Sequence, residues 1–169
     1  MVREVVRFPH PVLKTPTQKV EVIDDSIKSL VKDMFDTMYH EEGVGLAANQ
    51  IGVSLRVMVI DTSSKKEGPP IKLVLINPEV ISADGSIKYK EGCLSFPGLV
   101  LEVERYSKLV VKALNLDGEE RVYELEGFPA IVFQHEMDHL MGITFIDRVN
   151  GLKRRLALEK YAKLQKQKA

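Results

Sequence analysis

The chain has 169 residues, of which 44% are hydrophobic and 28% charged, the composition of a globular protein that can bury its own core. No apolar run reaches the roughly 18 residues of a membrane span, no signal peptide opens the chain, and the single cysteine excludes an internal disulfide. We therefore expect one cytoplasmic domain over residues 1–169 with no membrane partner. The 24 basic and 24 acidic residues cancel, which argues against a DNA-binding protein.

The first regular element that the sequence predicts is an amphipathic helix over residues 25–41. It follows a proline-rich, irregular lead-in over residues 5–20. Asp24 or Asp25 can cap its N-terminus, and Gly43 can end it. Six apolar residues recur at helical spacing and are expected to face the core. They are Ile27, Leu30, Val31, Met34, Phe35 and Met38.

The middle of the chain is predicted to consist of strands. Residues 55–61 and 72–77 are short apolar runs, and an Asn-Pro step is expected to end the second. Alternating polar and apolar residues predict further strands, and the Asp-Gly pair at 117–118 predicts a hairpin between the last two. These further strands span residues 87–90, 99–105, 109–115 and 121–125.

A second helix is predicted within residues 128–145. Pro129 suits a first helical turn, and Gly142 suits a helix end. The segment between them is apolar nearly all round, so we expect this helix to be buried.

The C-terminal segment predicts a basic helix over residues 151–167. Residues 151–169 carry seven basic side chains against Glu159 alone, a net charge of +6 that could contact an anionic partner. Its expected apolar seam consists of Leu152, Leu156 and Leu164. Together the elements predict an α+β fold, with mainly antiparallel strands around the buried helix, an N-terminal amphipathic helix and a C-terminal basic helix.

The buried helix contains an HExxH pattern formed by His135, Glu136 and His139. Histidines at i and i+4 lie on one face of a helix, where both rings can reach one metal ion. The intervening Glu136 can handle the proton of a metal-bound water. Two ordinary core histidines are the alternative, but several polar groups in a buried helix favour a metal, because unpaired polar groups are costly there. Asp138 could then hold a ligating group in place.

A catalytic metal site commonly uses three protein ligands and keeps one open position, so one ligand is missing. A third histidine of the metzincin type would fall at position 145, where the chain has Phe145. The only glutamate further along is Glu159, in the basic segment. Cys93 remains, and although a lone cysteine is usually a small buried hydrophobe, a thiolate with two imidazoles would complete a tetrahedral site with one vacancy.

Three segments resemble the motifs of one enzyme family, the peptide deformylases. Residues 43–50 (GVGLAANQ) are similar to the family's GxGLAAxQ motif, residues 91–95 to its EGCLS motif, and residues 134–139 (QHEMDH) to its QHExDH motif. Their order, approximate spacing and the chain length also match, so the resemblance covers essentially the whole chain as a single catalytic domain. It implies a metal-dependent hydrolase that removes the formyl group from the N-terminal formyl-methionine of newly made polypeptides and releases formate.

The resemblance also implies the roles of individual residues. The implied metal ligands are Cys93, His135 and His139, with water as the fourth. Glu136 would take the proton of that water and later pass it to the leaving amine. The oxyanion of the tetrahedral intermediate would be stabilised by the Gln50 side-chain amide and the backbone N–H of Leu94.

Substrate binding is expected to use strand pairing, in which an extended peptide bonds to the backbone near Gly45 and Gly92. The methionine side chain needs an apolar pocket, and residues from all three motif regions could line it. The expected wall residues are Val44, Leu94, Ile131 and His135. By similarity, Glu91 would pair with Arg105 and hold the metal-binding loop still.

Two further features concern parts of the chain that do not take part in the reaction. Val100 stands where many bacterial members carry an arginine, so the grip on residues after formyl-methionine is expected to differ, and the more apolar rim could favour self-association. The basic helix resembles the C-terminal extension with which some bacterial deformylases dock near the ribosomal exit tunnel, a contact that would be sensitive to salt. A solvated helix that only caps the fold explains the same pattern equally well.

The metal itself is not determined by the ligands. A set of one cysteine and two histidines suits Fe(II), Zn(II), Ni(II) or Co(II). The resemblance implies Fe(II) as the native ion, with Zn(II) or Ni(II) often found after aerobic purification.

Two other functions remain open from the residues alone. An HExxH peptidase that cleaves an internal amide would explain the helix but would leave Cys93 and Gln50 without a role. A binding module with a structural zinc would need a fourth protein ligand, for which only His10 and His40 remain among the histidines.

Overall fold

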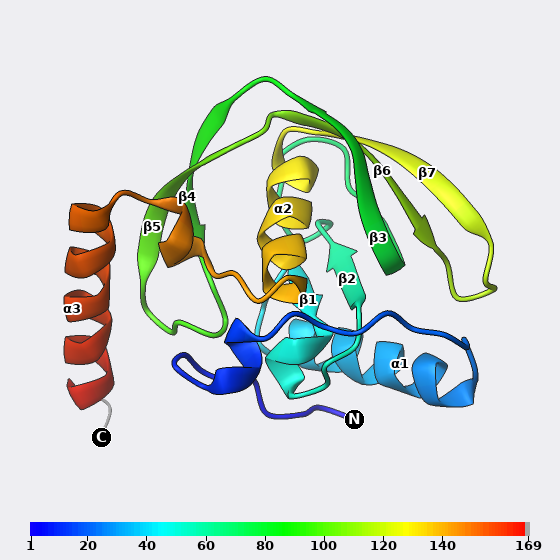
Figure 1. Ribbon diagram of the computed structural model, residues 1–169, viewed down its shortest axis with the longest axis horizontal. Helices are drawn as coiled ribbons and strands as arrows, with labels where there is room; N and C mark the ends of the chain where they lie inside the picture. Colours follow the sequence, from blue (N-terminus) through cyan, green and yellow to red (C-terminus); the bar gives the residue numbers. More distant parts are fainter. Residues whose placement is uncertain (168–169) are drawn as a thin grey trace.

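The computed structural model describes residues 1–167, which are arranged around a central helix (Figure 1). The α-helices are α1 (Asp25–His40), α2 (Phe128–Leu140) and α3 (Gly151–Gln167). Short 3-10 helices are η1 (Pro11–Lys14), η2 (Ala48–Ile51) and η3 (Phe145–Arg148). The strands are β1 (Gly45–Ala47), β2 (Val57–Asp61), β3 (Lys72–Asp84), β4 (Ile87–Gly92), β5 (Val100–Arg105), β6 (Lys108–Leu114) and β7 (Glu120–Glu126).

The strands form two antiparallel sheets. Five strands pair in the order β1-β2-β3-β6-β7, and β4 pairs with β5 in a second sheet. All pairings between these strands are antiparallel. Helix α2 stands between the β4–β5 pair and the larger sheet, with α3 outside the β4–β5 pair (Figure 1). The α+β fold with its N-terminal and C-terminal helices is therefore confirmed.

Helix α1 begins where its capping residue predicts. The Asp24 carboxylate accepts hydrogen bonds from the backbone N–H groups of Ser26 and Ile27 in the first turn, where N–H groups have no partner from a preceding turn of helix. The helix ends at His40, one residue before the expected end. Five of the six predicted core residues are buried against β1 and β2, and only Phe35 is half-exposed.

Strand β3 is longer than the sequence predicts, because the Asn-Pro step distorts the strand without ending it. Asn77 adopts a left-handed backbone conformation, with φ of 52°, which asparagine tolerates better than most residues. The register shifts between Ile76 and Glu79, a bulge at which a proline can be accommodated. The Asn77 side chain bonds both the N–H and the carbonyl of Val20, which ties the lead-in segment to this bulge.

Helix α2 packs against the larger sheet through a sheet–helix core. Its members are Ala47, Met58, Ile60, Leu75, Leu109, Val111, Ala113, Leu125, Ala130, Val132, Phe133 and Leu140. The helix starts with Pro129 in its first turn and is followed by Gly142, as expected. Gly142 has a φ of 77°, and a Cβ there would lie 2.8 Å from the carbonyl oxygen of Lys14. The predicted burial of α2 is confirmed.

The apolar seam expected on α3 is wrong in part. Leu152 and Leu156 are 61% and 52% exposed, whereas Ala157 and Tyr161 are buried. Tyr161 packs against the ring of Phe96, a residue that follows β4 and is fully buried. The helix therefore packs on the core through a face that is shifted by one residue from the expected one.

No helix within residues 1–167 combines the length and apolar character needed to cross a bilayer.

Val111→Ala should lower the free energy of unfolding by about 2 kcal/mol, because two buried methyl groups, worth roughly 0.8 kcal/mol each, are lost and a cavity is left behind. Val111 on β6 is fully buried in the sheet–helix core. The matched control is Val122→Ala on the neighbouring β7, where the side chain is 62% exposed and the change should stay within about 0.5 kcal/mol. Urea unfolding followed by circular dichroism measures both, and equal losses would contradict the assigned faces of the sheet.

Candidate metal centre

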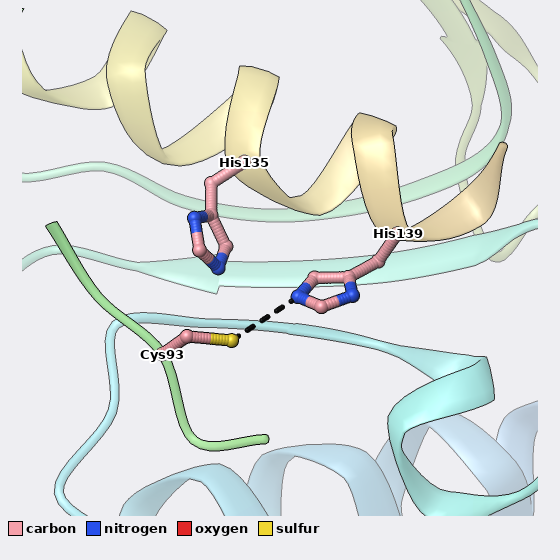
Figure 2. Close-up of side chains that lie close together, drawn as sticks. All are labelled: Cys93, His135 and His139. Atoms are coloured by element: carbon pink, nitrogen blue, oxygen red, sulfur yellow. Dashed lines mark hydrogen bonds between the residues drawn. The ribbon is translucent and has the colours of Figure 1, made fainter. Parts of the chain in front are cut away.

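Three ligand atoms from distant parts of the chain meet beside α2. One nitrogen each from His135 and His139 and the sulfur of Cys93 lie within 4.8 Å of one another. Figure 2 shows both rings projecting from α2 toward the loop that carries the cysteine. The Cys93 sulfur lies 3.3 Å from His139 Nε2. The structure thus brings together the three residues predicted as ligands.

The position of Cys93 is fixed by its neighbours in the loop after β4. The N–H of Phe96 donates to the carbonyl of Cys93, which closes a tight turn. Phe96 is fully buried and stacks on Phe8, with ring centroids 4.7 Å apart. The N–H of Phe8 also donates to the carbonyl of Ser95. Apolar burial of Phe96 and pairing with the lead-in segment therefore hold the thiol against α2.

His135 is oriented by Glu91 on β4. His135 Nδ1 donates to Glu91 Oε1 at 2.7 Å, which leaves Nε2 of the ring for the metal cluster. Arg105 on β5 binds both oxygens of the same carboxylate, at 2.8 and 2.9 Å. The side chains of Glu91 and Arg105 are each only 4% exposed. The expected pairing of Glu91 with Arg105 is present, and both oxygens of the Glu91 carboxylate are hydrogen-bonded within the protein.

Burial and neighbouring charges set the protonation of the cluster. Burial favours a higher pKa for Glu91, but hydrogen bonds from Arg105 and His135 outweigh it and hold the pKa below its usual value. Burial, with the positive charges of His135 and Arg105, holds the pKa of His139 well below its usual value. Burial raises the pKa of Glu136 to about 7. His139 is therefore neutral at neutral pH, the form in which imidazole binds a metal.

Glu136 lies on α2 with one oxygen unsatisfied. The residue is 5% exposed, and its Oε1 has no hydrogen-bond partner within residues 1–167. Strand β1 passes directly against it, since a Cβ on Gly45 would lie 2.7 Å from Glu136 Oε2 and 2.8 Å from Val132 Cγ1. Glycine is therefore required at position 45 for the strand to approach this carboxylate.

The amide of Gln50 is held in a defined orientation on η2. Its Oε1 accepts from the N–H of Ala47 at 3.0 Å, so its Nε2 turns toward the cysteine loop. There Nε2 donates to Ser95 Oγ at 3.2 Å and lies 4.0 Å from the Cys93 sulfur. The adjacent Asn49 donates to the carbonyl of His139 at 2.5 Å, which fixes this segment to α2.

The cluster opens into a cleft of about 670 Å³. Among the residues predicted for the site, the cleft is lined by Val44, Gly45, Gln50, Glu91, Gly92, Cys93, Leu94, Ile131, His135 and Glu136. His139 is fully buried and is absent from this lining. Val100 is 56% exposed and pairs in register with Gly92, so it stands on the strand beside the cleft.

Several residues of the cleft wall were not predicted from the sequence. Arg7 comes from the irregular lead-in segment, whose path no periodicity predicts. Tyr89 on β4 and Phe128 on α2 also line the cleft, and their rings lie 5.5 Å apart. The alternation of β4 could have identified Tyr89, because it shares a face of the strand with Glu91.

The donor set fits a divalent metal ion. One thiolate and two imidazoles are ligands that such ions accept in a four-coordinate site with one open position. Glu136, whose buried Oε1 has no hydrogen-bond partner within residues 1–167, is also among the residues that line the cleft. The arrangement can therefore hold a metal ion in a cleft that also contains a carboxylate able to accept a proton.

Comparisons with known proteins agree on one family. The model of the polypeptide deformylase family matches residues 2–155. A peptide deformylase from Aquifex aeolicus (strain VF5) is 67% identical over 166 residues, 98% of each chain. Two solved structures of peptide deformylases are similar throughout. One from Legionella pneumophila is 42% identical with a TM-score of 0.91, covering 99% of this chain and 98% of that one. One from Ehrlichia chaffeensis, in complex with actinonin, is 37% identical with a TM-score of 0.89, covering 96% of each chain.

His139→Ala should abolish stoichiometric metal binding, because it removes one of three ligands and leaves two open positions. His40→Ala is the matched control, since the His40 side chain is 64% exposed at the end of α1. Metal per chain after purification and dialysis, measured by elemental analysis, gives the result. Wild-type metal content in the His139 variant would contradict the assigned ligand set.

Proposed function

The chain belongs to the polypeptide deformylase family, and we propose from its geometry how it performs that family's reaction, the hydrolytic removal of the formyl group from N-terminal formyl-methionine. The observation that carries the proposal is the meeting of three ligand atoms beside a buried carboxylate with an unpartnered oxygen. Cys93, His135 and His139 would hold one divalent metal ion. We infer that Fe(II) is the native ion, with Zn(II), Ni(II) or Co(II) able to occupy the same ligands.

When bound, such an ion lowers the pKa of a water molecule and polarises the formyl oxygen. Glu136 accepts the proton of the attacking water through its unpartnered Oε1 and returns it to the amine of methionine as the C–N bond breaks. The burial of Glu136 keeps bulk water from competing for this proton.

The developing oxyanion is stabilised by two donors. The Gln50 amide is pre-oriented by Ala47, so its N–H groups already face the cysteine loop. The backbone N–H of Leu94 comes from the residue directly after Cys93 and lies in the same cleft wall. Donors fixed before the reaction do not have to reorganise as charge develops, and the loss of one typically costs about 100-fold or more in rate.

The peptide is expected to bind as an extended strand along the cleft. Among residues 1–167, β1 is an edge strand of the larger sheet and β4 has a strand partner only on the β5 side, so both can offer backbone groups to a peptide. Gly45 on β1 and Gly92 on β4 line the cleft at these edges. Val44 and Ile131 provide apolar walls for the methionine side chain.

We further propose that the protein acts as a single catalytic domain in the cytoplasm, on nascent chains at the ribosome. Formyl-methionine is found at the start of chains under synthesis, so the substrate itself favours this location. Leu152 and Leu156 are exposed on α3, which carries six basic residues, and this supports docking of α3 to the anionic ribosome surface. The buried Tyr161 on α3 donates to the carbonyl of Phe8, which joins the two ends of the domain.

Glu136→Gln should lower formate release from a formyl-Met tripeptide by about 100-fold or more, because the general acid–base group is lost. The metal content should stay at the wild-type level, since Glu136 is not a ligand. Glu126→Gln, a substitution at an exposed position of β7, is the control. The assay uses protein purified without oxygen, with its metal quantified.

Acetyl-Met tripeptide in the same assay tests the substrate. The wild type should release formate from the formyl peptide and leave the acetyl peptide intact. Cleavage of an internal amide without formate release would instead indicate a peptidase, and an unchanged rate in the Glu136 variant would refute the proposed proton transfer.

Charge reversal on α3 should abolish co-sedimentation with ribosomes at low salt, because the contact would be electrostatic. Substitution is preferable to truncation, since Ala157 and Tyr161 belong to the core. The variant changes three exposed lysines of α3 to glutamate: Lys153, Lys160 and Lys163. The control makes the same charge change at three exposed lysines elsewhere: Lys28, Lys88 and Lys108. Equal binding by both variants would refute docking through α3.

A further inference from the structure

A chain of charged groups leads from the surface to the metal cluster. Arg148, on η3, bonds Asp138 on α2, and Asp138 bonds Arg105 on β5. Arg105 in turn bonds Glu91, which accepts from His135. The charges alternate along this path, and each bond joins two different elements of the fold, the last one returning to α2 at His135.

We propose that Arg148 is a positioning residue for His135, acting through Asp138, Arg105 and Glu91. None of the three family-like motifs contains Arg148, which belongs to the turn before α3. The inference rests on the proposed role of His135 as a metal ligand.

Arg148 fixes the plane of the Asp138 carboxylate. Its Nη2 donates to Asp138 Oδ1 at 2.6 Å and its Nε to Oδ2 at 3.0 Å, so the planar guanidinium holds both oxygens. Oδ2 also accepts from Arg105 Nη1 at 2.6 Å. Without Arg148, the carboxylate could turn about its Cβ–Cγ bond, and this shared oxygen would no longer be held in the direction of Arg105.

Arg105 transmits this constraint because its donors are divided between two carboxylates. Nε and Nη2 bond Glu91, while Nη1 bonds Asp138. A planar guanidinium moves as a unit, so the loss of a fixed partner on one side loosens the orientation of the other. Glu91 Oε1 both receives Arg105 Nη2 and accepts from His135 Nδ1, so the ring orientation of His135 follows the position of Glu91.

The inner side chains of this network are buried, whereas Arg148 at its outer end is partly exposed to solvent. The side chains of Arg105 and Glu91 are 4% exposed and that of Asp138 is 11% exposed, so few waters can replace a lost partner. The Arg148 side chain is 45% exposed. Its replacement therefore leaves no large cavity and tests the orientation of the network with little disturbance of the core.

The test compares Arg148→Met and Arg148→Lys with Arg154→Met. Arg154 is a matched control, because it lies on α3, is 48% exposed, and makes one ion pair, with Asp147 at 3.4 Å. The first readout is the affinity for Co(II), from competition with a chelator. The second is the ring ¹⁵N signal of His135 in the metal-free protein, which reports the Nδ1 hydrogen bond without any activity measurement.

We expect Arg148→Met to weaken Co(II) binding by about 3- to 10-fold, less than the 10- to 100-fold typical for loss of a direct partner of a ligand. The His135 signal should shift as well. Arg148→Lys should recover little, because one ammonium cannot bind both carboxylate oxygens in a fixed plane. Arg154→Met should match the wild type.

Wild-type affinity and an unshifted His135 signal in Arg148→Met would overturn the inference, as would full recovery by lysine, which would reduce the role of Arg148 to charge alone. Urea unfolding shows whether each variant is folded. If the methionine variant does not fold, the lysine variant decides: reduced affinity supports the inference, and unchanged affinity refutes it. Failure of the wild type to bind Co(II) would instead refute the proposed metal function.

Discussion

The hydrogen bond between His135 and Glu91 is the contact on which the rest of the site depends. It joins α2, which carries both histidines, to β4, whose end leads directly into the loop of Cys93. A buried carboxylate is tolerated only when its charge is compensated, and Arg105 provides that compensation from β5. The relative position of thiol and imidazoles is therefore set by a buried hydrogen bond from the central helix to the β4–β5 sheet, whose carboxylate is kept charged by its ion pair with Arg105.

The two opposite faces of helix α2 have different roles, one in packing and one in the site. Its apolar side, including Phe133 and Leu140, packs into the sheet–helix core, while its polar side faces the cleft and the charged groups behind it. The approach of β1 at Gly45 brings a backbone edge against Glu136. Packing of the helix on the sheet thus determines where the ligands, the proton acceptor and the peptide-binding edge lie relative to one another.

Local patterns predicted those features whose causes are local. Helical spacing identified the histidine pair, because both rings belong to one turn of one helix. Cys93 was different, since no local signal places it beside His139: it was reached by setting aside the other possible third ligands, and the family resemblance then supported it. The buried face of α3 was misjudged at Leu152 and Leu156 because that face is decided by Phe96, brought from the β4–β5 loop. Contacts between distant segments thus limit what one sequence can reveal.

The ligands of the metal centre are added to each new chain at different times during its synthesis. His139 follows Cys93 by 46 positions, so at about 5–20 residues per second the ribosome needs roughly 2–9 seconds to add it after the cysteine. Through that interval the thiol exists without its histidine partner, and no arrangement of the unfinished chain can supply the full set of ligands. Until His139 has been added, an enzyme that acts on growing polypeptides cannot yet assemble its own metal centre.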